Sequence, residues 1–211
     1  MNQPELWLVR HGETPWSRSG QHTSHTDLEL TAKGRDEAMA VGRALGGRQF
    51  DLVTSSPMRR ARATAELAGY QPELDPDLHE WDYGDLEGLT TPEIREQYPG
   101  WTIWKGPWPG GEDDKAVGAR VDRFVDRVRD LGTGQRAVAF AHGHVLRAVA
   151  ARWTACPVDH GRLFTLGTAT LSVLGWEHGQ PAVRHWNVPS DLPSGPAEQA
   201  QGSGGGSGPK P

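Results

Sequence analysis

The chain has 211 residues, enough for one domain with a full hydrophobic core and too few for a large second domain. Its formal net charge of -5 at pH 7 argues against nucleic acid as a default partner, and its single cysteine excludes an internal disulfide framework. The N-terminus lacks the basic and then apolar pattern of a secretory signal, and no apolar run is long enough to span a bilayer. We therefore expect a cytoplasmic protein without a membrane partner.

Strand-like and helix-like patterns alternate along the chain, which predicts the α/β class. Continuous apolar runs indicate strands that are buried on both faces, as in a parallel sheet, and apolar residues at helical spacing indicate helices. In chain order we expect a strand over 6–9, a polar loop to 29, a helix over 31–46, a strand over 51–54, a helix over 56–67, a loop-rich cap over 81–112 with a short helix near 91–97, a helix over 114–131, a strand near 137–141, a helix from 145, and strands near 170–174 and 182–186.

Local signals predict two boundaries. Ser56 is expected to be an N-cap with Pro57 at the first helical position, because a hydroxyl accepts from free backbone N–H groups and proline is tolerated there. From residue 194 onward the chain consists mainly of Ser, Gly and Pro with almost no apolar residue. We therefore predict a folded domain over 1–193 and a disordered tail over 194–211.

Two of the expected strands end in the same dipeptide. Arg10 and His11 follow the first strand, and His142 follows the strand near 137–141, with a glycine after each histidine. A single histidine at a strand end is more often a hydrogen-bonded structural residue than a functional one. Ligands of parallel sheets lie beyond the carboxyl ends of the strands, however, so the pair indicates one site built from both ends of the chain.

Four motifs in order resemble the histidine phosphatase superfamily, which includes the cofactor-dependent phosphoglycerate mutases. They are Arg10-His11-Gly12-Glu13, Ser56-Pro57-Met58-Arg59-Arg60-Ala61-Arg62-Ala63-Thr64, Glu80 within His79-Glu80-Trp81-Asp82-Tyr83-Gly84-Asp85-Leu86-Glu87-Gly88, and Ala141-His142-Gly143. Each motif alone is weak evidence for the family, but all four occur in the expected order and together span about residues 6–147. The resemblance implies a three-layer α/β/α fold with a mostly parallel central sheet.

The resemblance also implies the roles of five residues, and the chemistry of phosphate esters agrees with them. Arg10, Arg60 and His142 would hold the phosphate, because a guanidinium can form two parallel hydrogen bonds to phosphate oxygens. His11 would attack phosphorus and become a phosphohistidine. Glu80 would protonate the leaving oxygen, since an alkoxide is a poor leaving group. These groups supply the electrostatic stabilisation themselves, so we expect no metal and no cofactor.

Further positions resemble the sedoheptulose-1,7-bisphosphatase branch of the superfamily. By that resemblance the substrate would also contact seven residues, which are Ser17, His22, Thr23, Trp81, Tyr83, His144 and Arg147. Trp81 directly follows Glu80 and is the best candidate for stacking on a sugar. The expected partner is a small phosphate ester, above all a sugar phosphate. The chain is shorter than that branch, so the preference for a bisphosphate stays open, as does assembly into a homo-oligomer.

Three functions stay open on the sequence. The leading one is a metal-independent phosphomonoesterase, the second is a mutase that protects its phosphohistidine from water, and the third is a phosphate-ligand-binding module without catalysis. Mutases carry Arg-x-Tyr after the acid residue, whereas this chain has Trp81-Asp82-Tyr83. An acidic side chain there would repel a second phosphate, which favours hydrolysis.

Two rival sites are weaker. Cys156 and Arg162 have the Cys-x5-Arg spacing of cysteine-dependent phosphatases, but a helix-like segment precedes them in place of a strand. With 18 arginines in the chain, such a match is expected by chance about once in twelve cysteines. His22 and His144 have neighbours at metal-ligand spacing but lack the further ligands that a metal site needs.

Overall fold

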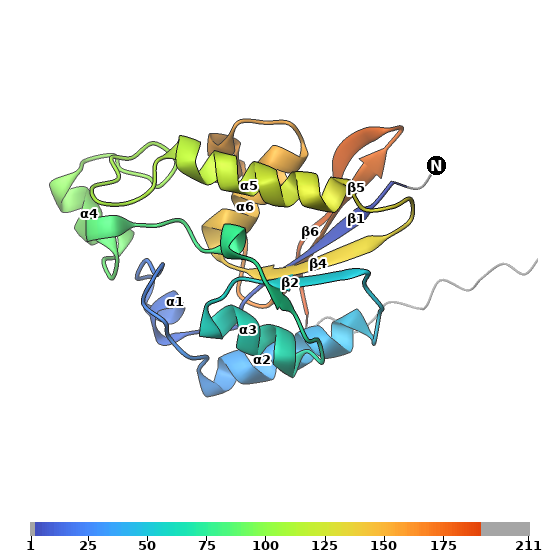
Figure 1. Cartoon of the computed structure of the whole chain (residues 1–211). Coiled ribbons are helices and arrows are strands. Elements are labelled where there is room, and N and C mark those ends of the chain that lie inside the picture. The colour runs from blue at the N-terminus through green and yellow to red at the C-terminus, as the bar shows by residue number, and fades with distance from the viewer. Residues whose placement is uncertain (1–2, 191–211) are drawn as a thin grey trace, which may run out of the picture.

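The protein has three layers, with helices on both faces of one central sheet (Figure 1). The computed structural model describes residues 3–190. Its strands are β1 (Glu5–Arg10), β2 (Leu52–Ser55), β3 (Glu73–Leu74), β4 (Arg136–Ala141), β5 (Thr170–Glu177) and β6 (Gln180–Pro189). Its helices are α1 (Pro15–Ser19), α2 (Ala32–Leu45), α3 (Arg59–Leu67), α4 (Thr91–Gln97), α5 (Asp114–Arg129) and α6 (Gly143–Trp153), with short 3-10 helices η1 (Pro76–Leu78), η2 (Gly84–Leu86) and η3 (Val158–Leu163).

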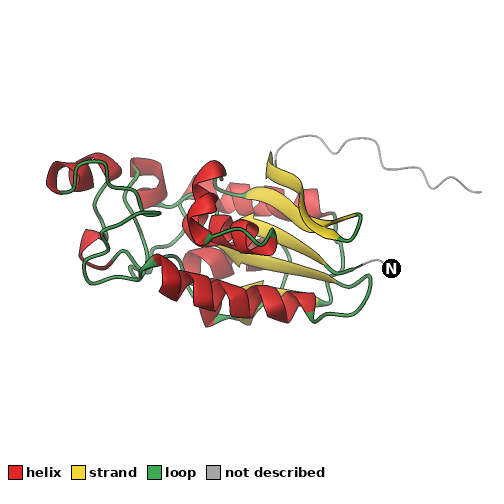
Figure 2. Cartoon of the chain, turned by 90° about the horizontal axis from the view of Figure 1, so that it is seen from above, coloured by secondary structure: helices red, strands yellow, loops and turns green. Residues whose placement is uncertain are grey.

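The first strand of the chain lies inside the sheet. The strand order is β3-β2-β4-β1-β5-β6, and the four strands from β3 to β1 run parallel. β5 runs antiparallel to both β1 and β6. The expected α/β/α architecture with a mostly parallel sheet is confirmed. Parallel pairing leaves the carboxyl ends of β1, β2 and β4 at one edge, where loops and α4 gather (Figure 2).

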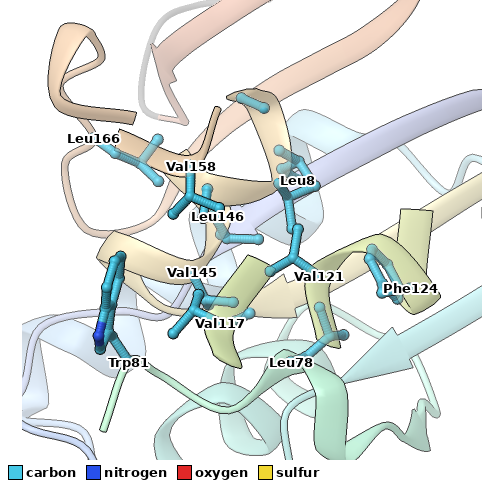
Figure 3. Packing of buried hydrophobic residues seen from close by; sticks show 14 of the residues in the cluster. Leu8, Leu78, Trp81, Val117, Val121, Phe124, Val145, Leu146, Val158 and Leu166 are labelled. Atoms are coloured by element: carbon cyan, nitrogen blue, oxygen red, sulfur yellow. The ribbon is translucent and has the colours of Figure 1, made fainter. Parts of the chain in front are cut away.

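Helices α2 and α3 cover one face of the sheet, and α5 and α6 cover the other (Figure 1). The valines and the phenylalanine of α5 recur at helical spacing, and all of them are buried on the face that packs against the sheet. Figure 3 shows Val117, Val121 and Phe124 in one cluster with Leu8 of β1. Burying such side chains contributes roughly 1.5–3 kcal/mol each. This core therefore anchors α5 on the strand that leads to His11.

Helix α3 begins three residues after the expected cap. Its N-cap is Met58, without a side-chain hydrogen bond, so the prediction of Ser56 as N-cap is wrong. The Ser56 hydroxyl accepts a long hydrogen bond of 3.4 Å from the backbone N–H of Met58, and it also bonds the ring of His142. The hydroxyl of Ser56 therefore bonds His142, the residue after the neighbouring strand β4, and does not cap α3.

Among the α-helices of residues 3–190, α1 has no counterpart in the expected elements. The structure places α1 within the predicted polar loop, and none of its residues is buried. Without a buried stripe a five-residue helix leaves no hydrophobic period to detect. Its N-terminus carries a capping box between Thr14 and Ser17, and that pair is the local signal that could have revealed it.

The loop after β1 touches the start of α2 at two glycines. A Cβ on Gly12 would lie 2.3 Å from the carbonyl oxygen of Gly34, and a Cβ on Gly34 would lie 2.1 Å from that of Glu13. Both distances are far below a van der Waals contact, so neither position accepts a side chain without backbone movement. This contact fixes the His11 loop against α2.

Residues 81–112 form loops around two short helices, η2 and α4 (Figure 2). No helix within residues 3–190 is both long and apolar enough to cross a membrane. The predicted tail over 194–211 lies outside the described residues.

Candidate active site

His11 and His142 lie side by side because β1 and β4 are paired in parallel. Arg10 is the register partner of Ala141, so each histidine is the first residue beyond its strand. The backbone N–H of His11 donates to the carbonyl of Ala141 at 2.9 Å, and the two imidazole centroids are 5.2 Å apart. The inference that both ends of the chain build one site holds for this pair.

The His11 ring has a defined tautomer. Its Nδ1 lies 2.8 Å from the carbonyl oxygen of Gly12, which can only accept, so Nδ1 carries the proton and Nε2 keeps its lone pair. Burial, followed by the charges of Arg60 and Arg10, lowers the pKa of His11 well below its ordinary value. His11 is therefore neutral near pH 7, with Nε2 available as a nucleophile.

His142 has the opposite tautomer. Nε of Arg60 donates to its Nδ1 at 3.1 Å, and its Nε2 lies 2.8 Å from Oγ of Ser56. Because arginine only donates, Nδ1 must accept, and Nε2 carries the proton. Burial first and Arg60 second lower the pKa of His142 well below its ordinary value. This imidazole is neutral, its Nε2–H is bound to Ser56, and it does not line the cavity described below, so the expected contact with a phosphate is not available in this arrangement.

Arg60 is fully buried beside His142 and does not line the cavity described below. Its Nη1 donates to the carbonyl of Thr26, and its Nη2 donates to the carbonyls of Thr23 and Ser24, at 3.1–3.3 Å. With Nε bound to His142, four of its five N–H groups are occupied. In this arrangement Arg60 has no free fork for a phosphate, contrary to expectation. It instead fastens the loop over 23–26 to His142.

Glu80 is 7% exposed and lies at the N-terminus of α6. Its Oε1 accepts from the backbone N–H groups of Val145 and Trp81 at 2.8 and 2.9 Å, and its Oε2 accepts from that of His144 at 3.0 Å. The first N–H groups of a helix lack intrahelical partners, which makes this end a natural place for a carboxylate. The helix fixes the orientation of the carboxyl group.

Most of the predicted site residues line one cavity of about 180 Å³ at this edge of the sheet. The predicted members are Arg10, His11, Ser17, His22, Thr23, Glu80, Tyr83, His144 and Arg147. Sequence reasoning missed Thr14, Gly20, Gln21, Gly143 and Leu166, which complete the lining. Arg10 donates through Nη1 to the carbonyl of Leu166 at 2.5 Å, and its buried Nε has no hydrogen-bond partner within the described chain. An unpaired cationic N–H beside His11 suits an anionic ligand.

Three aromatic side chains form an uncharged wall of the cavity. The Tyr83 hydroxyl lies 2.5 Å from Nδ1 of His144, and the His22 ring lies 4.7 Å from the Tyr83 ring. Burial raises the pKa of Tyr83 and lowers the pKa of His144 well below its ordinary value. Burial also lowers the pKa of His22 to about 4. Apart from the guanidinium of Arg147, this wall is therefore neutral and polar, whereas Arg10 makes the His11 end of the cavity cationic.

Trp81 does not reach the cavity, so the expectation that it stacks on a sugar does not fit the structure. Its side chain is completely buried, and its Nε1 donates to the carbonyl of Glu112 at 2.8 Å. The ring lies 5.5 Å from Trp104 and 6.3 Å from Trp108, measured between centroids. Figure 3 shows it in the core cluster with Val145. The residues of the 81–112 segment therefore pack around the indole of Trp81, which is part of the hydrophobic core.

The described residues offer no evident metal centre. Within residues 3–190, no group of three or more His, Cys, Asp or Glu side chains is arranged to hold a metal ion. The free Cys156 lies three residues beyond the end of α6, and Arg162 is bound to Asp159 at 2.7 Å, so the two residues form no phosphate-binding loop.

Known proteins resemble this chain in sequence and in fold. The chain is 43% identical over 177 residues to an acid phosphatase of Mycobacterium tuberculosis, covering 82% of this chain and 87% of that protein. It is 37% identical over 183 residues to the sedoheptulose 1,7-bisphosphatase of Saccharomyces cerevisiae, covering 71% and 67%. A solved structure of an open reading frame from M. tuberculosis superposes with a TM-score of 0.85 at 40% identity, covering 88% of this chain and 98% of that one. Residues 6–189 match the histidine phosphatase superfamily (branch 1), and the chain belongs to that family.

Proposed function

We propose that this protein is a metal-independent phosphomonoesterase that hydrolyses small phosphate esters, above all sugar phosphates, through a phosphohistidine on His11. One observation carries the proposal. The His11 ring is neutral, with its proton on Nδ1 and a lone pair on Nε2, inside a cavity that also contains Arg10 and Glu80. A nucleophile, a cation for the phosphoryl oxygens and a proton donor are thus within one small space.

The proposed first step transfers the phosphoryl group to the protein. Nε2 of His11 attacks phosphorus, and the bond between phosphorus and the ester oxygen breaks. The Arg10 guanidinium stabilises the charge on the phosphoryl oxygens, with the positive charge of Arg60 behind it. The departing oxygen takes a proton from Glu80 and leaves as an alcohol.

The second step releases phosphate. The Glu80 carboxylate accepts a proton from water, the water oxygen attacks phosphorus, and the bond from phosphorus to Nε2 breaks. Phosphate leaves, while Glu80 regains its proton and His11 its lone pair. Oε1 accepts two backbone hydrogen bonds and Oε2 only one, so we assign the transferred proton to Oε2.

The size and chemistry of the cavity support a small, polar leaving group. About 180 Å³ holds a phosphate with a few carbons and hydroxyls, and the neutral wall of Tyr83, His144 and His22 offers hydrogen-bonding groups to hydroxyls. The name of the yeast relative agrees with a sugar phosphate. We favour hydrolysis over mutase chemistry because the completely buried Trp81 stands where mutases carry an arginine after the acid residue, so that position offers no cation to a second phosphate.

A covalent trapping experiment tests the proposal. Incubation with a radiolabelled phosphate ester, followed by an alkaline quench that preserves phosphohistidine, should leave label on His11. His11→Ala should lose the label and all turnover, whereas His178→Ala, at a side chain that is 93% exposed, should retain both. Label on another residue, or turnover in His11→Ala, would refute the mechanism. Conversion of 3-phosphoglycerate to its isomer faster than phosphate release would favour the mutase.

A further inference from the structure

Arg120 lies beneath the segment that carries Glu80, and the proposed chemistry does not use it. The residue comes from the buried face of α5 and is only 7% exposed. Its Nη1 donates to the backbone carbonyls of Asp77 and His79, both at 2.8 Å, and its Nη2 donates to that of Glu80 at 3.2 Å. One guanidinium therefore binds three carbonyls that lead up to and include the acid residue.

The same guanidinium forms a forked ion pair with Glu112. Nε and Nη2 of Arg120 donate to Oε1 and Oε2 of Glu112 at 2.8 and 2.9 Å. Glu112 in turn binds the segment after the acid, because its Oε2 accepts from the backbone N–H of Asp82 at 3.0 Å and its carbonyl accepts from Nε1 of Trp81 at 2.8 Å. The pair thus holds the chain immediately before and immediately after Glu80.

We propose that Arg120 is a positioning residue that, together with Glu112, holds the backbone on both sides of Glu80, so that the carboxyl group oriented by α6 stays in place for proton transfer. The inference rests on the proposed role of Glu80 as the acid. Glu80 belongs to a stretch without a regular helix or strand, between η1 and η2, so the backbone ladder of an element does not fix it. Proton transfer requires the donor oxygen within hydrogen-bond reach of the leaving oxygen, and small displacements are costly.

Two other arginines of α5 also bind the segment before Glu80, but they contact only its side chains. Arg123 binds the side chain of Asp77, and Arg127 binds the side chains of Asp75 and Glu73, at the protein surface. They tie α5 to the same region without touching the backbone of Glu80 or its neighbours 79 and 81. Arg123, 63% exposed, is therefore a matched control for the attachment of α5 alone.

The test compares leaving groups in wild type, Arg120→Lys, Glu112→Gln, Glu80→Gln and Arg123→Lys. Lysine keeps the charge but cannot bind three carbonyls and a carboxylate together. The rate of the first phosphoryl transfer is measured by rapid quench for p-nitrophenyl, phenyl and glycerol phosphate. An acid matters most for the most basic leaving oxygen, so loss of its positioning steepens the dependence of rate on leaving-group pKa.

We expect Arg120→Lys to lose about tenfold or more on glycerol phosphate and less than about threefold on p-nitrophenyl phosphate, with Glu112→Gln between it and wild type. Arg123→Lys should follow wild type on all three esters. Adding Arg120→Lys to Glu80→Gln should cost little more than Glu80→Gln alone, because both changes remove the same proton transfer.

Three results would overturn the inference. Equal losses on all three esters in Arg120→Lys would mean a structural role, and so would losses that simply multiply with those of Glu80→Gln. Wild-type rates in Arg120→Lys would mean no role at all. If Glu80→Gln itself shows no dependence on the leaving group, the acid assignment of the proposed function fails, and the positioning role fails with it.

Discussion

The Nε–H of Arg60 donates to Nδ1 of His142 at 3.1 Å, with both side chains removed from solvent. This one contact determines which nitrogen of His142 carries a proton, and it places a positive charge directly behind the imidazole. The other Arg60 bonds go to the carbonyls of Thr23, Ser24 and Thr26. The tautomer of His142 and the shape of the loop at the cavity mouth therefore depend on the same side chain.

Replacing Arg60 should strongly lower activity, although its side chain does not line the cavity. Arg60→Lys keeps the charge but leaves the His142 bond or the loop carbonyls unpaired, so we expect kcat/KM to fall about a hundredfold. The assay is steady-state hydrolysis of p-nitrophenyl phosphate. Arg62→Lys, on the same helix and 45% exposed, is the control and should behave as wild type. Activity within about threefold of wild type in Arg60→Lys would contradict the assignment.

Chelation should not affect the proposed reaction. In the proposed reaction, Arg10 and Arg60 supply the positive potential that Mg²⁺ supplies in many other phosphoryl-transfer sites. Overnight incubation with EDTA, followed by assay in chelated buffer, should leave the rate unchanged. Loss of activity that Zn²⁺ or Mn²⁺ restores would instead support a metal site at His22 and His144.

The His22 ring should make folding stability sensitive to acid. Burial lowers its pKa to about 4, whereas in the unfolded chain it titrates near 6.5. The neutral ring therefore contributes its full stability above about pH 6.5, and that contribution is lost as the pH falls toward 4. We expect wild type to lose about 2–3 kcal/mol more than His22→Gln between pH 7 and pH 4, measured by urea denaturation. Parallel losses in both proteins would show that the ring is not buried as described.

The glycine contact between α2 and the His11 loop should be intolerant of a methyl group. Gly34→Ala would ordinarily favour a helix by about 1 kcal/mol, but here the new Cβ meets a carbonyl oxygen at 2.1 Å. We therefore expect a net destabilisation of about 1–3 kcal/mol in thermal or urea unfolding. Ala44→Gly, at an exposed position of the same helix, measures the propensity effect alone. Stability equal to or above wild type in Gly34→Ala would refute the close contact.

The residues at strand ends were the most predictable part of this site. Apolar runs locate β1 and β4, and parallel pairing then places His11 and His142 at one edge. Residues of the cap were less predictable, because an irregular segment has no period that tells a buried indole from an exposed one. Trp81 is the example, since only the tertiary fold shows that the cap closes over it.

The remaining differences between prediction and structure arise from hydrogen bonds to residues that are distant in the sequence. Ser56 has the local signature of an N-cap, yet its hydroxyl bonds His142 instead. Arg60 and Arg120 both bind backbone carbonyls of distant loops, and every residue type has a carbonyl. No sequence pattern marks such an acceptor, so these two roles became visible only in three dimensions.

The central position of β1 has a consequence for how the molecule comes into being. Its neighbours β4 and β5 come from the last third of the described chain, so β1 leaves the ribosome long before either of its partners. Until β4 arrives, His11 has neither the Ala141 carbonyl nor the His142 ring beside it. Such distant pairing slows folding, because a long loop must close before contacts compensate for the lost chain entropy. During refolding, enzymatic activity should therefore appear late and abruptly, because it requires β1 to be paired with β4.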